Sequence, residues 1–397
     1  MTGQAARPVR LGIVAGETSG DQLGGGLMRA LATLFAAEGR SVEFIGIGGD
    51  EMTAAGLQSL VPFASLSVNG FVEPLRKLPF LLRTLRRVTD QCMTSRVDAF
   101  IGVDFNVFNL LIERRLQKHG IPTIHYVSPS VYAWRRGRTR SLARSTDLLL
   151  TLYPFEPAFY RDLPIQAVCV GHPLAQLIGA SAGSPAARVE ARAELGIDEQ
   201  TALVALLPGS RRSEIRLMAP VFIAAARILH RDLGASFVLP CVRRELEPML
   251  QSMLDANTDV PVRLLVGNAR KALVACDGAL VKSGTGTLEA MCIGRPIVVS
   301  YKLGRWSYQL ARRLIKTPFV ALPNILAGRA LVPEFLQDDA TPEKLAGALV
   351  REMQMAKADP EYLVRFRKLR ESLAIGGGAD VEAGKAVFRF LGQSCSS

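Results

Sequence analysis

Several patterns that identify a particular chemistry are missing from this 397-residue sequence. Its six cysteines contain no C-x-x-C pair, and its four histidines do not combine with them into a zinc-binding pattern. There is no D-x-D sequence, no G-x-x-x-x-G-K-[ST] loop and no apolar stretch of the roughly 20 residues that cross a bilayer. We therefore expect no metal and no cofactor. We also expect buried, reduced thiols in a cytoplasmic protein that is soluble or peripheral to a membrane.

The sequence is long, rich in apolar residues and positively charged. A chain of 397 residues that is 49% hydrophobic can form two domains, each with its own core. The net charge of +12 indicates an acidic partner, which can be a nucleic acid, an anionic membrane surface or a phosphorylated substrate. We expect no nucleic acid, because the chain has neither a known nucleic-acid-binding module nor a row of stacking aromatic residues.

Short apolar runs alternate with helical patterns in both halves of the chain, which predicts parallel sheets covered on both faces. The predicted strands are Arg10–Ala15, Val42–Ile47, Ala99–Val103, Thr123–Val127, Leu148–Thr151, Ala167–Val170, Ala202–Leu207, Ser236–Pro240, Val262–Leu265, Gly278–Val281 and Pro296–Ser300. The predicted helices begin near Gly20, Asp50, Glu73, Phe108, Arg138 and Glu156 in the first half and span Arg216–Leu233, Arg244–Ala256, Ala269–Ala275, Gly286–Cys292 and Thr341–Met355 in the second.

The alternation of strands and helices is interrupted between the halves, where the small residues of 180–187 indicate a linker. We predict an N-terminal domain over residues 1–172 and a C-terminal domain over 173–369, each a doubly wound α/β sheet. Ligands of such sheets bind outside the carboxyl ends of the strands, here in a cleft between the halves. The segment at about 370–397 is predicted to be helical and to pack back on the first domain.

The clearest loop follows the strand predicted at Gly278–Val281. Glycines in Ser283-Gly284-Thr285-Gly286 let a ligand approach the backbone where a helix begins, and a helix N-terminus favours anions. Glu289 lies about one turn into that helix, where it can accept hydrogen bonds from ribose hydroxyls. The NAD fingerprint G-x-G-x-x-G is not met, because Glu289 occupies the position of its third glycine. The alternative is an ordinary tight turn.

A second loop, ALLPGSRRSEI at 205–215, places Arg211 and Arg212 beside a predicted helix start. A guanidinium at this position suits a diphosphate leaving group. Without a D-x-D sequence, arginine and helix dipoles have to stabilise such a group. The alternative is that these arginines are simply solvated.

Two loops of the first half carry carboxylates. In IVAGETSGDQLGGGL at 13–27, a strand leads into Glu17 and Ser19, which indicates a substrate loop; the alternative is that Asp21 merely caps the helix. In FIGVDFNVFNLL, Asp104 ends a strand. A carboxylate there can serve as a general base toward a hydroxyl group, which is typically worth ~10²–10⁴ in rate. The alternative is a capping aspartate.

A basic amphipathic segment, FVEPLRKLPFLLRTLRRV, spans 71–88. Its apolar residues recur in steps of four and three, with basic residues between them. Such a segment suits an anionic membrane surface, at ~1 kcal/mol per Lys or Arg close to it, and the alternative is a helix that packs on the core. A second basic stretch, at 135–144 after His125, suits a phosphate, an anionic lipid or plain solvation. The predicted membrane contacts are Val68, Phe71, Val72, Leu75, Leu78 and Leu82.

Taken together, these segments resemble the lipid-A-disaccharide synthase family of glycosyltransferases, which has the GT-B architecture of two Rossmann-like domains facing a cleft. The matching stretches run in order from residue 15 to 337 and are AGETSGDQLGGGL, IGIGGDEM, NGFVEPL, GVDFNVFN, TIHYVSPSVYAWR, GHPL, LLPGSRRSEI, SGTGTLEAM, RPIVVSYK and LPNILAGRALVPEFLQ. The resemblance implies that UDP-2,3-diacylglucosamine and 2,3-diacylglucosamine 1-phosphate react with inversion to give a lipid A disaccharide 1-phosphate and UDP. It also implies a protein that is peripheral on the anionic inner face of the inner membrane.

The resemblance assigns roles to individual residues. It implies that Asp104 is the base for the acceptor 6-hydroxyl. The residues that it places at the substrates are Glu17, Ser19, Arg211, Ser283, Gly284, Thr285, Gly286, Thr287, Glu289 and Asn324. The family loop usually has the sequence D-x-P-D-F-N, whereas here it is Asp104-Phe105-Asn106-Val107-Phe108-Asn109, without the proline and the second acid. Tyr132 also stands where the family commonly has Trp.

Two other interpretations stay open at this point. A UDP-N-acetylglucosamine 2-epimerase would use the same scaffold and a UDP site, although it would not need the amphipathic segment. The other concerns assembly, because the C-terminal segment can pack back within one chain or across a homodimer.

Overall fold

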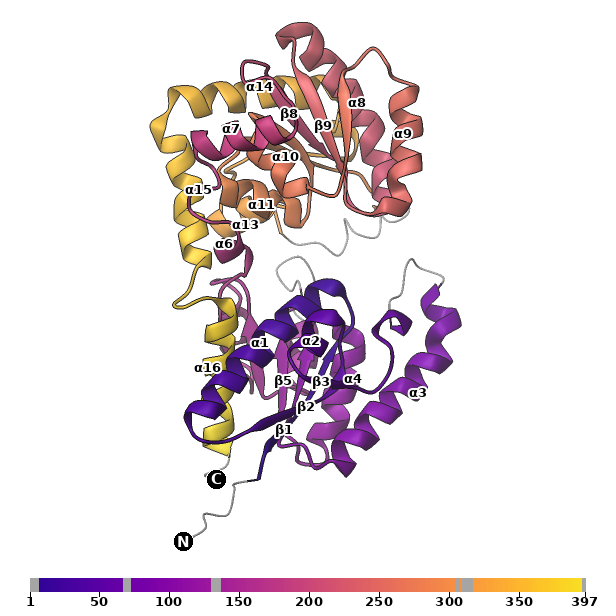
Figure 1. Ribbon diagram of the computed structural model, residues 1–397, viewed down its shortest axis with the longest axis vertical. Coiled ribbons are helices and arrows are strands. Elements are labelled where there is room, and N and C mark those ends of the chain that lie inside the picture. The colour runs from indigo at the N-terminus through magenta and orange to yellow at the C-terminus, as the bar shows by residue number, and fades with distance from the viewer. Residues whose placement is uncertain (1–6, 67–72, 130–136, 305–307, 309–316, 395–397) are drawn as a thin grey trace. The chain divides into compact units, whose positions relative to one another are not determined.

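A computed structural model describes residues 7–66, 73–129, 137–304, 308 and 317–394 of the chain. The chain forms two compact units (Figure 1), which are Met1–Pro173 with Leu373–Ser397, and Leu174–Ser372. We call them unit 1 and unit 2. The chain therefore leaves unit 1 once and returns to it for the last helix.

Unit 1 is built on a parallel sheet of seven strands in the order β3-β2-β1-β4-β5-β6-β7. The strands are β1 (Val9–Ala15), β2 (Val42–Ile47), β3 (Leu57–Ser59), β4 (Ala99–Val103), β5 (Thr123–Tyr126), β6 (Leu148–Thr151) and β7 (Gln166–Cys169). The helices are α1 (Thr18–Ala37), α2 (Asp50–Ala54), α3 (Glu73–Thr94), α4 (Asn106–Gln117), α5 (Gly137–Ala143) and α16 (Ala379–Ser394), with 3₁₀ turns η1 (Phe63–Ser65) and η2 (Pro157–Tyr160). Strand order reverses between β1 and β4, and doubly wound sheets bind ligands at such a switch point.

Helices cover both faces of this sheet. On one face, α3 and α4 bury Leu85 and Ile112 in a core with Phe100 of β4. On the other face α1 packs on the sheet, and α16 runs beside α1 (Figure 1). The rings of Phe35 and Phe388 lie 4.9 Å apart between these two helices. The last helix of the chain is therefore part of the unit 1 layer that covers the sheet.

Unit 2 has a parallel sheet of six strands in the order β10-β9-β8-β11-β12-β13, so its switch point lies between β8 and β11. The strands are β8 (Leu203–Leu207), β9 (Ser236–Cys241), β10 (Val262–Val266), β11 (Gly278–Lys282), β12 (Ile297–Tyr301) and β13 (Glu334–Leu336). The helices are α6 (Leu174–Leu177), α7 (Pro185–Glu194), α8 (Arg212–Leu233), α9 (Glu247–Asp255), α10 (Ala269–Ala275), α11 (Thr285–Ile293), α13 (Leu322–Ala327), α14 (Pro342–Ala358) and α15 (Pro360–Leu373), with 3₁₀ turns η3 (Arg244–Leu246) and η4 (Gln337–Asp339). The main core of the unit lies where α8, α9 and α14 pack on the sheet, around Phe222 and Leu349.

The buried strands were predicted well. Val42–Ile47, Ala99–Val103 and Leu148–Thr151 have the predicted bounds, because each is an apolar run between polar segments. The edge strands β3 and β13 were not predicted, since each has three residues and little burial. The helix predicted near Glu156 is only the 3₁₀ turn η2.

The linker predicted at 180–187 is wrong in its second half, where α7 begins at Pro185. The Ser184 hydroxyl accepts a hydrogen bond from the Ala187 N–H at 3.2 Å and so caps the helix. Proline at the first helical position costs nothing, because its missing N–H would have no partner within the helix. The small residues of this stretch are thus a helix start.

The amphipathic segment forms α3, and its apolar residues do not all face the same way. Leu85 is buried in the unit 1 core, whereas Leu78 and Leu82 are 48% and 45% exposed. Three predicted membrane contacts, Val68, Phe71 and Val72, lie outside the described residues, as does the side chain of Leu75. In the described part of the chain, no helix is long and apolar enough to cross a membrane.

Candidate active site

The switch point of unit 1 brings together the loops that follow β1 and β4. These strands are neighbours in the sheet, with Ala15 paired to Val103. A Cβ atom on Gly16 would lie 2.3 Å from the ring of Phe105, so the two loops are in direct contact and Gly16 leaves the room for it. Glu17 and Ser19 are exposed at the start of α1 beside this contact. The structure therefore places Glu17, Ser19 and Asp104 at one edge of the sheet.

Asp21, in the first turn of α1, does cap a helix, although the helix is α2 and not its own. Its buried carboxylate accepts hydrogen bonds from the backbone N–H groups of Gly49 at 2.7 Å and of Glu51 and Met52 at 3.1 Å. These N–H groups lie at the N-terminus of α2, where they have no acceptor within the helix. Asp21 thus fixes α2 against α1.

Asp104 sits on a strained turn. Asp104 and the following Phe105 have φ angles of 49° and 46°, in the left-handed region that costs a residue with a side chain about 1–3 kcal/mol. The Asn109 side chain donates to the Asp104 carbonyl at 2.8 Å and helps to hold this turn. Burial raises the pKa of the Asp104 carboxyl, while the charge of His125 and a hydrogen bond from the Phe105 backbone act to lower it. A carboxylate with a raised pKa is a stronger proton acceptor.

A chain of polar side chains leads from Asp104 into the core of unit 1. Asn106 Nδ2 donates to Asp104 Oδ1 at 3.1 Å, and Asn106 Oδ1 lies 3.1 Å from His125 Nε2. His125 Nδ1 lies 2.6 Å from Glu113 Oε1, and both side chains are fully buried. Thr146 donates to the other Glu113 oxygen at 2.6 Å. The sequence alone assigns no role to His125 and gives no sign of Glu113, because the contacts join residues on different elements.

The switch point of unit 2 brings together the loops after β8 and β11. Arg211 immediately precedes α8, and its side chain is 71% exposed. Glu214, in the first turn of α8, accepts hydrogen bonds from the N–H groups of Ser210 at 3.1 Å and Arg211 at 3.3 Å. Gly209 has a φ of 120°, and a Cβ atom there would lie 2.5 Å from Glu214. The loop thus depends on a glycine and presents an exposed guanidinium.

The loop after β11 depends on a glycine as well. Gly284 has a φ of 154° and a ψ of −163°, a conformation essentially restricted to glycine. The Ser283 hydroxyl donates to the Val320 carbonyl and the Thr287 hydroxyl to the Gly284 carbonyl, both at 2.7 Å. These two hydroxyls therefore stabilise the loop itself. Thr285 is exposed at the first position of α11, where a helix presents free N–H groups.

Lys282 is the last residue of β11, and the sequence alone does not mark it as a site residue because it continues an apolar strand. Its Nζ lies 3.0 Å from Glu214 Oε1 and 4.7 Å from the centre of the Tyr301 ring. Burial acts to raise the pKa of the Glu214 carboxyl, but Lys282, the Ser210 N–H and Arg211 together lower it. Lys282 therefore connects β11, β12 and the start of α8 beneath the two loops.

Glu289 and Asn324 are placed differently from one another. Glu289 is half-buried in α11, where burial raises the pKa of its carboxyl and the charge of Arg270 acts to lower it. Asn324 is fully buried. Its amide nitrogen donates to the Val332 carbonyl at 2.9 Å, and its oxygen accepts from the Leu331 N–H at 2.7 Å. The carboxamide of Asn324 is thus engaged within unit 2, and its predicted contact with a substrate stays a prediction.

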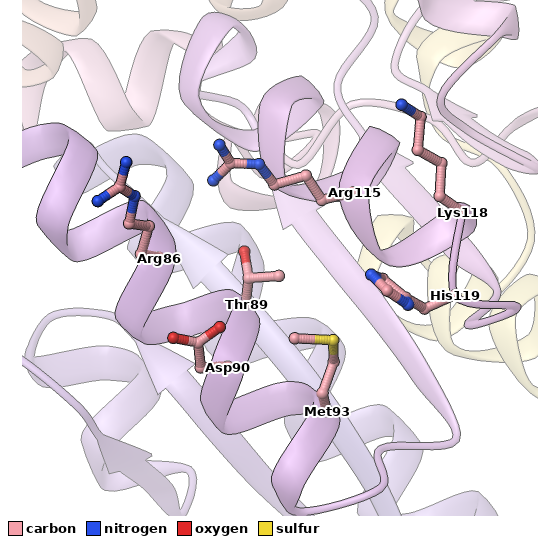
Figure 2. Close-up of a pocket in the computed structure, with 7 residues that line it drawn as sticks. All are labelled: Arg86, Thr89, Asp90, Met93, Arg115, Lys118 and His119. Carbon is pink, nitrogen blue, oxygen red and sulfur yellow. The ribbon is translucent and has the colours of Figure 1, made fainter.

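A groove on unit 1 lies between α3 and α4 (Figure 2). Cationic side chains dominate it, and its lining residues are Arg86, Thr89, Asp90, Met93, Arg115, Lys118 and His119. Lys118 and His119 follow the C-terminal end of α4, whereas Asp104 precedes its N-terminal end. The groove is therefore separate from the switch point. Among the residues described, no three His, Cys, Asp or Glu side chains gather so that they could hold a metal ion.

Comparison with known sequences matches nearly the whole chain. A family model described as Lipid-A-disaccharide synthetase matches residues 11–374. The chain is 48% identical over 345 residues to the lipid-A-disaccharide synthase of Azotobacter vinelandii, covering 86% of this chain and 89% of the relative. It is 44% identical over 390 residues to that of Pseudomonas syringae pv. tomato, covering 98% and 99%.

Solved structures share the architecture at low sequence identity. WaaG, a glycosyltransferase involved in lipopolysaccharide biosynthesis, matches with a TM-score of 0.57 and 15% identity over 96% of this chain and 99% of WaaG. The UDP-GlcNAc 2-epimerase of Neisseria meningitidis matches with a TM-score of 0.60 and 11% identity over 98% and 100%. The two doubly wound units thus have the GT-B fold. With this fold and the match over residues 11–374, the chain belongs to the lipid-A-disaccharide synthase family of glycosyltransferases, which act in lipid A biosynthesis.

Proposed function

We propose that this glycosyltransferase joins UDP-2,3-diacylglucosamine to 2,3-diacylglucosamine 1-phosphate, giving a β-1,6-linked lipid A disaccharide 1-phosphate and UDP. Membership of the family supports this pair of substrates. The observation that carries the residue roles is the position of Asp104, a mostly buried carboxylate on a strained turn at the switch point of unit 1. A strained backbone conformation persists only where the surrounding structure enforces it, and such residues cluster at functional sites.

On the acceptor side, the Asp104 carboxylate takes the proton from the 6-hydroxyl of the acceptor sugar. The hydroxyl oxygen attacks the anomeric carbon of the donor from the face opposite UDP. The bond between that carbon and the UDP oxygen breaks, its electron pair leaves with UDP, and the anomeric configuration inverts. Glu17 and Ser19 are exposed beside Asp104 and suit the hydroxyl groups of the sugar.

On the donor side, the UDP leaving group gains negative charge as the bond breaks. The N-terminus of α11, at Gly284–Thr287, presents backbone N–H groups and a positive dipole end to the diphosphate. The exposed guanidinium of Arg211 adds a full positive charge beside the neighbouring strand. Glu289, further along α11, suits the ribose hydroxyls. These groups stabilise the transition state because they are already oriented before charge develops.

Both substrates carry acyl chains, so the enzyme has to take them from a membrane. We propose that α3 provides this contact on the anionic inner face of the inner membrane. Leu78 and Leu82 are exposed apolar side chains, and Arg83, Arg86 and Arg87 are exposed on the same helix. Exposed leucines beside arginines suit insertion among acyl chains and attraction to anionic headgroups.

The test is an assay of purified protein with both diacylglucosamine substrates, with the disaccharide and UDP measured separately. The proposal predicts equal amounts of disaccharide 1-phosphate and UDP. UDP-GlcNAc alone is the control, and an epimerase would convert it without any acylated acceptor. Absence of disaccharide, or conversion of UDP-GlcNAc to its epimer, would contradict the proposal.

A further inference from the structure

We propose that His125 and Asn106 are positioning residues for Asp104, with Glu113 fixing the His125 ring, and that this network holds Asp104 as an ionised base. The inference rests on the proposed function in that Asp104 is taken as the base. It adds three residues that act through Asp104. Two of them, His125 and Glu113, are fully buried on different elements, β5 and α4.

The direction of each hydrogen bond follows from the chemistry of the groups. An ionised Asp104 accepts only, so Asn106 has to present its NH₂ group to it, as the 3.1 Å contact shows. The Asn106 oxygen then faces His125 Nε2, which must carry a hydrogen to donate across 3.1 Å. The other ring nitrogen, Nδ1, lies 2.6 Å from Glu113 Oε1, and this contact fixes the ring in the orientation that brings Nε2 to Asn106.

From His125 Nε2 onward, the donors of this network therefore point toward Asp104. Thr146 and Glu113 fix the ring, the ring fixes the Asn106 amide, and the amide donates to the carboxylate. If His125 lost the hydrogen on Nε2, the Asn106 amide would turn over to donate to it. Its oxygen would then face Asp104, and the carboxylate would lose a donor and meet an acceptor. The network thus favours the ionised form of Asp104, which is the form that accepts a proton.

The backbone around Glu113 is shaped to make room for its carboxylate. Gly102 of β4 lies directly against it, and a Cβ atom on Gly102 would approach Glu113 Oε1 to 2.2 Å. A buried contact between two ionisable side chains is weak evidence for stability, because hydrophobic residues of similar volume often stabilise a core equally well. Here the pair is connected to Asp104, because His125 Nε2 contacts the half-buried Asn106 and Asn106 donates to Asp104.

The bridge depends on the amide side chain of Asn106. The D-x-P-D-F-N pattern that the resemblance implies for this loop would put proline at this position, and proline has no amide side chain to place between a histidine and an aspartate. Val107, at the position of the second acid of that pattern, is 80% exposed. In this chain a single carboxylate remains in the loop, and the bridge supports that carboxylate.

The test uses a matched pair of substitutions at His125, because the amide nitrogen of glutamine falls near Nε2 of histidine and that of asparagine near Nδ1. His125→Gln keeps a donor for Asn106, while His125→Asn keeps only the contact with Glu113. Asn106→Ala removes the bridge on a half-buried loop. Gln117→Ala, which removes a 2.9 Å hydrogen bond to Asp147 at the far end of α4, is the control for loss of a polar contact on that helix. Melting temperatures show that each variant is folded.

We expect His125→Asn and Asn106→Ala to lower kcat by about 10-fold to 100-fold, since misplacing a catalytic group costs this much. The acid limb of the kcat profile moves to higher pH in both, because Asp104 loses a donor to its ionised form. KM for the UDP-sugar stays unchanged. His125→Gln stays within about 3-fold of the parent, and His125→Asn has no further effect in the Asn106→Ala background, as residues that act in series require.

Equal losses in His125→Gln and His125→Asn, or an unmoved acid limb, would overturn the network. Multiplied losses in the double variant would do the same. Asp104→Asn separates this failure from failure of the proposed function. If Asp104→Asn is inactive and His125→Asn is fully active, the network is contradicted and Asp104 stays the proposed base. An active Asp104→Asn removes Asp104 as the base and the network with it.

Discussion

The ammonium group of Lys282 lies 3.0 Å from the carboxylate of Glu214, and this ion pair ties the end of β11 to the first turn of α8. Both side chains are largely buried, at 15% and 13% exposure. Glu214 also accepts hydrogen bonds from the N–H groups of Ser210 and Arg211. The pair therefore connects the loop that carries Arg211 to the loop that begins at Ser283.

Replacing Lys282 with methionine should weaken UDP binding by about 10-fold, which corresponds to ~1.4 kcal/mol. Glu214 would keep a partly buried charge with only the exposed Arg211, 3.8 Å away, as a cation, and the two loops would lose their link. Lys344→Met is the matched control, because Lys344 pairs with Asp339 on an exposed helix start of the same unit. Isothermal titration with UDP measures both variants. Equal affinity in parent and Lys282→Met would show that the pair does not support the donor loops.

Gly284→Ala should destabilise the loop after β11 by about 1–3 kcal/mol, because alanine does not tolerate a φ of 154°. UDP binding should fall with it, since the N-terminus of α11 would move. The control is Gly347→Ala inside α14, where alanine is the better helix former and stability should rise by about 0.5–1 kcal/mol. Thermal melts with and without UDP compare the two. A Gly284→Ala variant that binds UDP normally would contradict the assignment of this loop.

Changing Leu78 and Leu82 together to serine should weaken binding to anionic vesicles by at least about 10-fold. Each leucine contributes about 1.5–3 kcal/mol when it is fully buried in an apolar phase. Leu233→Ser, at an exposed position on α8 of unit 2, is the control. Sedimentation with vesicles of mixed anionic and zwitterionic lipid measures the partition. If the double variant sediments like the parent, α3 is not the membrane contact.

Val107→Asp restores the acid that the family loop usually carries. Val107 is the second residue of α4 and is 80% exposed, so an aspartate there fits without strain and gains about 0.3–1 kcal/mol from the helix N-terminus. We expect kcat to stay within about 3-fold of the parent, because in the proposed mechanism Asp104 alone serves as the base. An increase of 10-fold or more in a steady-state assay would instead show that Asp104 alone is an incomplete base.

The fold could be predicted from the sequence wherever burial dominates. Ala99–Val103 is buried at every position and stands out as an apolar run, so β4 and the residue that follows it could be located. Short edge strands such as β13 have no such signal. The start of α7 was misinterpreted because Ser184 and Pro185 are common in linkers as well as at helix N-termini.

Only those residues of the candidate site that belong to the loop after a strand could be predicted from the sequence. Asp104, Arg211 and Gly284 each follow a strand, and strand ends determine which residues reach the edge of a parallel sheet. The contacts of His125 with Glu113 and of Lys282 with Glu214 join residues 12 and 68 positions apart. No periodicity or motif records such contacts, so the side chains that support the loops became visible only in the folded structure.

The most direct test of the central claim compares turnover and UDP binding in Asp104→Asn. Its amide is nearly isosteric with the carboxylate but does not take up a proton, so kcat should fall by about 10²–10⁴. UDP affinity, measured by titration, should stay within about 2-fold, because the loops proposed to bind UDP belong to unit 2. Burial raises the pKa of Asp104, so in the parent the rate should fall as pH drops through a value above the ordinary aspartate range. An Asp104→Asn variant that still forms disaccharide at the parental rate would contradict the account.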